Sequence, residues 1–510
     1  MEDRPRTLRL ALSTVWPGLR YLGLGVWVAW LFLISSGSIW LSDVEADGFY
    51  LANLMLLMTV SSAVVCLAAP YAQRIYGMLL ARRRVLMGVA SLASLGALGV
   101  IAAGPYYLGT SFDTAWIFWP SIVLMGVFSG AFSLKCGQLF GGMEPRRVML
   151  YTLLSEMTMV ALSYFVLGNN IFSPVQGGPP LSGIAGFALL PLLAAYLVCL
   201  PAEGVPDAPA PCSPLRDLPP AFLRFLVVIF VFTVVSETVR CYFVFVRMPS
   251  LTYLDSIVVL LLRTLFAVLM LAFALRSHKR LYFSRMYLFS LVAIAVAMAL
   301  IPLLQIYNTV LGGIIGFASN VLVLLIWCLL AGVTFEKRIP AIVVFGFGRG
   351  ALLVGQACGW LLGIWLLPQL AGTRWEIVCY VGVAIVILVM VTLFFSERQF
   401  DRLFGEIAKA QISLDLSSSF GSGDRKKHRP WHEACRRAGE QAMLSSREQE
   451  IFELLVVGRS PDNIAAHLVL SLHTVRTHIR NIYGKFDVHN KAELVSYVEA
   501  ILNEKDGRKQ

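Results

Sequence analysis

The sequence has little charge for its length. Only 14% of its 510 residues are Asp, Glu, Lys or Arg and 57% are hydrophobic, whereas soluble proteins carry about 25% charged residues. A composition this apolar excludes a wholly soluble globular protein, and it also excludes a disordered one. Most of the chain is therefore predicted to lie in lipid.

The sequence also lacks the residue patterns of metal sites, disulfide frameworks and enzymes. Its nine cysteines are scattered, most of them within apolar runs, and none forms a Cys-x-x-Cys pair. This distribution indicates small buried side chains. The sequence contains no phosphate-binding loop and no nucleophile–base arrangement. We therefore expect neither an enzyme nor a cofactor.

Long apolar runs dominate residues 1–396. Each run is about 20 residues long, which is enough to cross a hydrocarbon core of about 30 Å as a helix. Arg and Lys fall almost entirely on one alternating set of loops, and only Arg247 and Arg374 fall on the other. Because positive residues stay on the cytoplasmic side, we predict a multi-pass inner (plasma) membrane protein with both termini in the cytoplasm. The twelve predicted spans are 20–41, 49–70, 85–104, 115–134, 148–167, 183–201, 222–246, 255–275, 285–305, 310–333, 341–367 and 377–396.

The twelve spans divide into two halves of six. The Pro/Ala-rich loop 202–220 separates the halves, and the basic loops 74–84 and 276–285 occupy the same place in each half. Such repetition is typical of secondary transporters. The architecture resembles the major facilitator superfamily, although residues 81–84 keep only the basic end of that family's loop signature. The resemblance implies an all-α, transporter-like bundle.

Ionisable residues inside the predicted spans are candidates for function, because a charge in lipid is costly. Glu237 and Arg240 lie three residues apart in span seven and can pair on one helix face, whereas Arg263 and Arg349 have no evident partner. One interpretation is a polar cavity between the halves that binds a small molecule, with anions among the candidates. The other is a set of internal ion pairs that fix helix packing. The candidate sensing residues are Glu156, Glu237, Arg240, Arg263 and Arg349.

Residues 397–443 are predicted to form a cytoplasmic linker. Residues 397–410 can form a short amphipathic helix along the membrane face, and 413–430 has the composition of a flexible segment. A wholly flexible linker of this length would have a root-mean-square span of roughly 35–40 Å. The segment that follows is therefore expected to work close to the membrane.

Residues 444–510 carry start signals for four short helices. Ser445-x-x-Glu448 and Asn490-x-x-Glu493 are capping boxes of the first and fourth helices. Ser460-Pro461 starts the second helix, and Ser471 is the predicted cap of the third. This third helix has an apolar inner face at 475, 479 and 482 and carries arginines at 476 and 480 on its outer face. A short helix, a tight turn and a helix with exposed arginines predict a helix-turn-helix that enters the major groove of DNA.

The same residues resemble the LuxR-type DNA-binding domain of bacterial regulators, also called the FixJ/NarL type. The match covers 444–498 and centres on the run HTVRTH at 473–478. It departs from the family at Leu472, where Pro is frequent, and at Asp487, where Gly is frequent. The resemblance implies a homodimer through the fourth helix that binds double-stranded DNA. RNA polymerase is a further candidate partner. The base-reading residues that the resemblance implies are Arg476, Thr477 and Arg480, and the backbone-contacting or bracing residues that it implies are Thr474, His478 and Lys485. His473 belongs to the same predicted DNA-binding set.

The sequence is compatible with three functions. The leading hypothesis is a membrane-anchored one-component transcription regulator, in which the bundle 1–396 senses a small molecule or a membrane state and the domain 444–510 binds promoter DNA. The alternative is a transporter with an appended regulatory DNA-binding domain. The third is a constitutively active DNA binder whose membrane part sets only its location.

Overall fold

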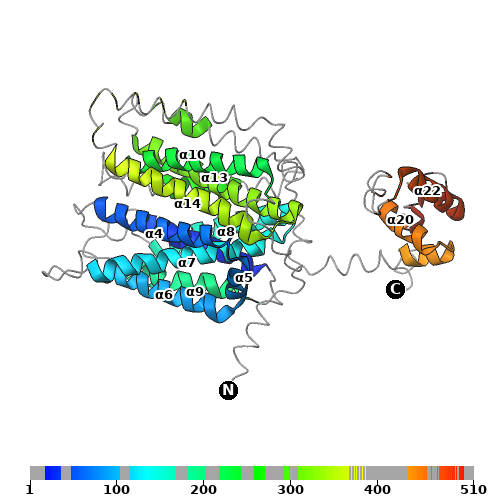
Figure 1. Cartoon of the computed structure of the whole chain (residues 1–510), viewed down its shortest axis with the longest axis horizontal. Helices are drawn as coiled ribbons and strands as arrows, with labels where there is room; N and C mark the ends of the chain where they lie inside the picture. The colour runs from blue at the N-terminus through cyan, green and yellow to red at the C-terminus, as the bar shows by residue number, and fades with distance from the viewer. Residues whose placement is uncertain are drawn as a thin grey trace, which may run out of the picture. The chain divides into compact units, whose positions relative to one another are not determined.

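The structure is a computed structural model in which all the described secondary structure is helical. The chain divides into two compact units, Met1–Leu414 and Asp415–Gln510 (Figure 1). The described residues lie within 18–35, 48–103, 115–167, 181–200, 218–242, 258–269, 292–300, 308–385, 435–456 and 461–498, with gaps in 292–300, 366–385 and 461–498.

The N-terminal unit is a bundle of long apolar helices (Figure 1). In its described part, six helices are long and apolar enough to cross a membrane, and a seventh span is added if the bent pair α4–α5 counts as one. The segment 258–269, on predicted span eight, is a shorter apolar helix. Most of predicted spans nine and twelve lies outside the described residues, so the count of twelve stays a prediction. The bounds are η1 Leu19–Leu22, α2 Gly23–Ser35, α4 Gly48–Ala68, α5 Gln73–Ala81, α6 Arg83–Ala103, α7 Ala115–Gly141, α8 Pro145–Leu167, α9 Leu181–Val198, α10 Pro220–Tyr242, α13 Asn308–Lys337 and α14 Ala341–Trp365.

The basic segment after the second span is helical, whereas the sequence predicted a loop over 74–84. Its helix α5 turns away from α4 by 112°. The bend falls at Pro70, which cannot continue the hydrogen-bond pattern of α4, and Gln73 Nε2 donates to Pro70 O over 2.8 Å. Ile75 and Met78 of α5 are exposed next to arginines. An exposed apolar strip beside basic residues is typical of a helix that lies in a membrane interface.

Contacts between the helices follow the six-plus-six repeat. Within the halves, α2 packs on α8 and α10 packs on α14, which are spans one and five and spans seven and eleven. Between the halves, α4 packs on α14, and α8 meets segment 258–269 through Tyr164–Thr264 and Glu156–Arg263. If six is added to each span number, the contact between spans one and five becomes the contact between spans seven and eleven. In the same way, the contact between spans two and eleven corresponds to the contact between spans eight and five. An internal repeat predicts this correspondence.

Glycines allow these helices to approach closely. A Cβ atom on Gly359 of α14 would lie 2.6 Å from Val234 O of α10, and one on Gly96 of α6 would lie 2.6 Å from Ser121 O of α7. Either added methyl group would clash with the neighbouring backbone and force the two helices apart. Small residues permit this close approach of backbones between membrane helices. At these positions, glycines of predicted spans three and eleven serve helix contacts.

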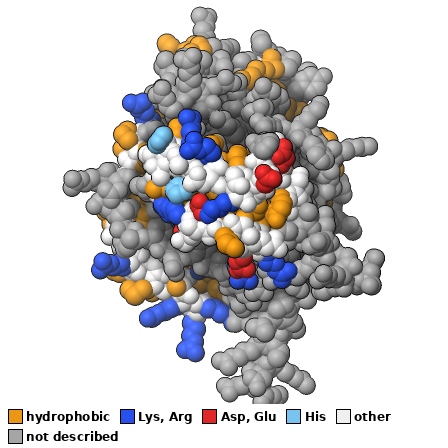
Figure 2. Space-filling model, turned by 90° about the vertical axis from the view of Figure 1, so that its right-hand side faces the viewer, with side chains coloured by type: hydrophobic (Ala, Val, Ile, Leu, Met, Phe, Trp, Pro, Cys, Tyr) orange, Lys and Arg blue, Asp and Glu red, His pale blue; other side chains and the backbone are white. Residues whose placement is uncertain are grey.

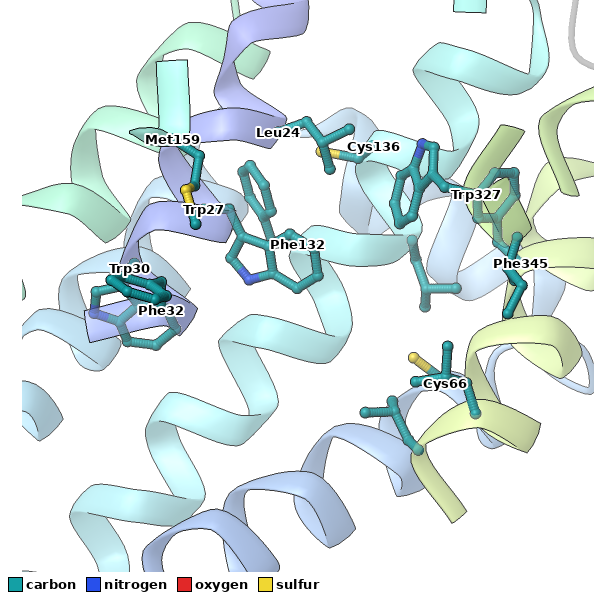
Figure 3. Packing of buried hydrophobic residues seen from close by; sticks show 14 of the residues in the cluster. Leu24, Trp27, Trp30, Phe32, Cys66, Phe132, Cys136, Met159, Trp327 and Phe345 are labelled. Carbon is teal, nitrogen blue, oxygen red and sulfur yellow. The ribbon is translucent and has the colours of Figure 1, made fainter. Parts of the chain in front are cut away.

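Aromatic side chains fill the core of the N-terminal unit (Figure 3). Trp27 of α2 lies beside Phe132 of α7, with ring centres 5.8 Å apart. Trp327 of α13 packs against Phe345 of α14, with ring centres 5.0 Å apart. Trp30 is fully buried, and its Nε1 donates to Phe187 O over 3.0 Å. The core therefore draws on helices from both halves of the bundle.

The C-terminal unit is a small helical domain with a core of its own. It contains a helix over 435–441, α20 Ser446–Val456 and α22 Leu472–Phe486. Phe452 stacks on Phe486 with ring centres 4.9 Å apart. Cys435 and Ala438 are buried in the same core, so residues 435–441, within the predicted linker, pack with this unit.

Candidate nucleic-acid interface and buried charges

Helix α22 begins at the predicted cap. Ser471 Oγ accepts from Thr474 N over 3.1 Å and lies 2.7 Å from Thr474 Oγ1. The side chains of Val475, Ile479 and Ile482 are buried. Arg476 and Arg480 are exposed on the outer face of the same helix. The predicted cap and the predicted orientation of α22 are therefore confirmed.

The other five residues of the predicted DNA-binding set, His473, Thr474, Thr477, His478 and Lys485, also lie on α22. His473 is exposed, and Thr474, Thr477 and His478 are half-buried. Thr477 Oγ1 donates to His473 O over 2.9 Å, and the buried Nδ1 of His478 has no hydrogen-bond partner in the described structure. Figure 2 shows one face of the molecule, on which Lys, Arg and His side chains lie near one another.

Lys485 braces α22 against the start of α20. Its Nζ donates to Glu448 Oε2 over 2.7 Å and to Met443 O over 2.9 Å. Glu448 also completes the predicted capping box, because its Oε2 accepts from Ser445 N over 2.8 Å and its N donates to Ser445 Oγ over 3.3 Å. Of the two roles that the family resemblance offered for Lys485, the structure shows bracing.

The predicted cap of the fourth helix is also formed. Glu493 N donates to Asn490 Oδ1 over 2.9 Å, and Asn490 Nδ2 donates to Glu493 Oε1 over 2.5 Å. Leu494 and Val498 of the fourth helix are fully buried. Together the Ser445–Glu448 box, Ser471 and Asn490 cap three of the four predicted helices.

The Glu448 carboxylate makes the stability of this unit depend on pH. Its hydrogen bonds to Lys485 and Ser445 lower its pKa from 4.5 to about 2. A lowered pKa gives stability that is fully present above about pH 4.5 and is lost as pH falls toward 2. We expect Glu448→Gln to lower the free energy of unfolding of residues 415–510 by about 2–3 kcal/mol at pH 7, and by far less near pH 2.

Urea unfolding between pH 7 and pH 2 measures this difference. Glu450→Gln is the matched control, since Glu450 is exposed and pairs only with exposed Arg447 within the described structure. That change should cost less than about 1 kcal/mol. An equal loss from Glu448→Gln at all pH values would contradict the account.

Helix α22 ends at a residue in the left-handed conformation. Asp487 has φ 53° and ψ 44°, and its N–H donates to Tyr483 O. Glycine adopts this conformation without the clash that a Cβ brings. We expect Asp487→Gly to raise the free energy of unfolding by about 0.5–1 kcal/mol and Asp487→Ala to lower it. Thermal unfolding of both variants checks the order, and a less stable glycine variant would refute it.

Glu156 and Arg263 form a buried ion pair between the two halves of the bundle. Arg263 Nη2 donates to Glu156 Oε2 over 2.6 Å, and Arg263 Nε donates to Glu156 Oε1. The two side chains are only 2% and 4% exposed. The sequence showed no partner for Arg263, because its partner lies 107 residues away in the other half. For this pair the structure favours the packing interpretation.

Glu237 of α10 is also engaged. Its Oε2 accepts from Trp360 Nε1 of α14 over 2.9 Å. Arg240 belongs to α10, but its side chain lies outside the described part, so the predicted Glu237–Arg240 pair stays a prediction.

Arg349 of α14 is buried without an acidic partner in the described structure. Its guanidinium carbon lies 5.5 Å from the Trp27 ring centre and 5.8 Å from the Trp327 ring centre. Its Nε is buried and makes no hydrogen bond. Sequence reasoning missed two further cations nearby, Arg20 and Lys135. Predicted span four ends at residue 134, one residue before Lys135, but α7 continues to Gly141 and includes Lys135.

Comparison with known proteins identifies the C-terminal unit. Residues 442–498 match the family described as bacterial regulatory proteins, luxR family. The chain is 47% identical over 55 residues to the monoamine regulon transcriptional regulator of Klebsiella aerogenes, which covers 11% of this chain and 24% of that protein. It is 41% identical over 58 residues to the CsgBAC operon transcriptional regulatory protein of Escherichia coli, covering 11% of this chain and 27% of the relative. The match thus spans about a quarter of each relative.

Solved structures align with the membrane unit. The crystal structure of the human organic anion transporter MFSD10 (TETRAN) aligns with 74% of this chain and 98% of its own at 15% identity, with a TM-score of 0.49. The xylose transporter XylE from E. coli aligns with 74% of this chain and 97% of its own at 14% identity, with a TM-score of 0.48. Residues 442–498 are therefore a luxR-family helix-turn-helix domain, and the same chain contains a helical membrane unit.

Proposed function

We propose that this protein is a membrane-anchored transcription regulator that binds promoter DNA through α22 and senses a signal through its membrane unit. The observation that carries the proposal is the outer face of α22, where Arg476 and Arg480 are exposed one turn apart. The Ser471 cap and the Lys485–Glu448 brace hold that helix in place. An exposed helix of this kind fits the major groove, where Arg can donate two hydrogen bonds to guanine.

The DNA-binding unit is proposed to act as a homodimer through its fourth helix. Leu494 and Val498 of this helix face the domain core, whereas Tyr497 is 39% exposed and is available to a second copy. Two recognition helices would then read two half-sites about one helical turn apart. The predicted orientation places this unit in the cytoplasm, on the side where DNA is found.

Sensing is proposed to work by a population shift between two arrangements of the bundle halves. A ligand changes such an equilibrium only if it binds the two arrangements with different affinity. Contacts that cross between the halves, such as Glu156–Arg263 and the α4–α14 packing, can differ between the two arrangements. The output would be a change in the exposure or oligomeric state of the tethered DNA-binding unit.

A chimera tests the sensing role. Residues 1–396 are replaced by an unrelated membrane anchor, and a reporter gene under the cognate promoter is followed while the signal is varied. We expect the chimera to bind DNA but to lose the regulated change in output. A chimera that still responds to the signal would show that the membrane unit sets only location.

The second candidate is a transporter that also regulates its own operon. The six-plus-six pattern of helix contacts supports this second candidate, because such a repeat is typical of secondary transporters. Vesicles that contain the full chain separate the two functions, since accumulation of a labelled compound above the level in empty vesicles requires transport.

A further inference from the structure

The interior of the membrane unit holds an excess of positive charge. Arg20 of η1 and Arg349 of α14 are 7% and 6% exposed, and Lys135 of α7 is half-buried. On α7, Lys135 follows Phe132 by three residues, and the Phe132 ring lies 5.8 Å from the Trp27 ring. Tyr21, next to Arg20, packs on Phe140, whose ring lies 6.0 Å from the Trp327 ring. None of the three cations forms an ion pair with an acidic residue in the described structure.

The buried acids of the described membrane unit are engaged elsewhere. Glu156 pairs with Arg263, and Glu237 accepts from Trp360. A third acid, Glu336 near the end of α13, is half-buried. Arg20, Lys135 and Arg349 form no ion pair with any of these acids within the described residues. Buried charges in proteins are normally paired, because an isolated ion in a poorly polarisable interior is strongly disfavoured.

The same region has N–H donors without acceptors. Arg20 Nε, Arg349 Nε, Trp27 Nε1 and Trp327 Nε1 are all buried and make no hydrogen bond in the described structure. Buried polar groups normally have a partner, and those that lack one call for a ligand, an ion or water. Four donors beside three positive charges favour a negatively charged acceptor.

Aromatic rings surround Arg349. The ring centres of Trp27 and Trp327 are 6.4 Å apart, and the guanidinium lies near both. Figure 3 shows these two tryptophans entering the core from different helices, α2 of the first half and α13 of the second. Ligand sites combine apolar and aromatic walls with a few charged groups that fix orientation. A planar organic anion meets both requirements better than an inorganic one.

We propose that the membrane unit binds a small organic anion of the aromatic carboxylate class, with Arg349 as its anchor, Lys135 and Arg20 as supporting positive charges, and Trp27 and Trp327 as apolar walls. The proposal deepens the sensing function proposed above, because the site draws on both halves of the bundle. Glu156, Arg263 and Glu237 have no part in binding the anion.

The test is thermal unfolding of the purified full chain in detergent. Benzoate is the probe. Benzamide and benzylamine are its neutral and cationic counterparts, acetate lacks the ring, and inorganic phosphate is an anion without an apolar body. Benzoate at about ten times its Kd should raise the Tm of the membrane unit by about 2–4 °C, and the other four compounds should raise it by less.

Variants assign the effect to Arg349. Arg349→Gln should abolish the benzoate shift and leave the ligand-free Tm equal or higher, because it removes an uncompensated buried charge. Arg349→Lys should restore part of the shift, and Lys135→Gln should reduce it. Arg84→Gln is the matched control, since Arg84 is exposed, and it should behave as the unmodified protein does.

Four outcomes would overturn the proposal. They are an equal shift with benzamide, a larger shift with phosphate, a benzoate shift that survives in Arg349→Gln, and no shift with either carboxylate. None of these results would bear on DNA binding by α22. The proposed regulatory function is tested separately, by the chimera and by the DNA-binding variants.

Discussion

The double variant Arg476→Ala/Arg480→Ala should lose specific DNA binding by about a hundredfold or more, because each bidentate arginine–guanine contact is worth about 1–3 kcal/mol. Both side chains are exposed, and Val475, Ile479 and Ile482 hold α22 to the core without them. The variant should therefore fold normally. Fluorescence anisotropy of the full chain on a labelled promoter fragment, with unlabelled non-specific DNA as competitor, measures the loss.

The matched control removes the same charge elsewhere on the C-terminal unit. Arg436 and Arg437 are exposed on helix 435–441, outside the helix-turn-helix. Replacing both by Ala should weaken specific and non-specific binding alike, through the general attraction to phosphates, and should reduce the salt dependence slightly. Equal losses of specificity in the two double variants would contradict a base-reading role for α22.

Breaking the Glu156–Arg263 pair should produce the largest loss of stability in the membrane unit. Removal of one member leaves the other charge buried and alone, which typically costs about 3–5 kcal/mol. Both Glu156→Gln and Arg263→Met are therefore expected to unfold at a much lower temperature than the unmodified protein. Replacing both members by apolar residues, as in Glu156→Leu/Arg263→Met, should recover most of that loss, because no uncompensated charge remains.

Thermal unfolding of the full chain in detergent compares these variants. Glu237→Gln serves as the control, since an amide oxygen can still accept the hydrogen bond from Trp360. It should shift the unfolding temperature much less than Glu156→Gln does. If the double variant were no more stable than the single ones, the pair would contribute through geometry rather than through charge compensation.

Features of the fold set by neighbours along one helix could be predicted from the sequence. The Ser445–Glu448 box, the Ser471 cap and the two faces of α22 depend on residues three or four positions apart. That spacing is visible in the sequence. The location of six apolar helices on predicted spans was likewise readable from the length of the runs.

Features set by distant contacts could not be predicted. The partner of Arg263 lies 107 residues away, and no local pattern indicates it. The burial of Arg20 and Lys135 depends on where η1 and α7 end and on which helices cover them. The same applies to helix 435–441. Its short sequence does not indicate which unit it packs on, whereas in the structure Cys435 and Ala438 are buried in the core of the C-terminal unit.

Chromatin immunoprecipitation of the full-length protein, combined with membrane fractionation, tests the central claim most directly. It is performed beside the Arg476→Ala/Arg480→Ala variant at equal expression. The account predicts discrete peaks on promoter DNA from a protein that remains in the membrane fraction, and it predicts that these peaks vanish in the variant. Peaks that persist in the variant, or no peaks from the unmodified protein under any growth condition, would contradict a membrane-anchored regulator that reads DNA through α22.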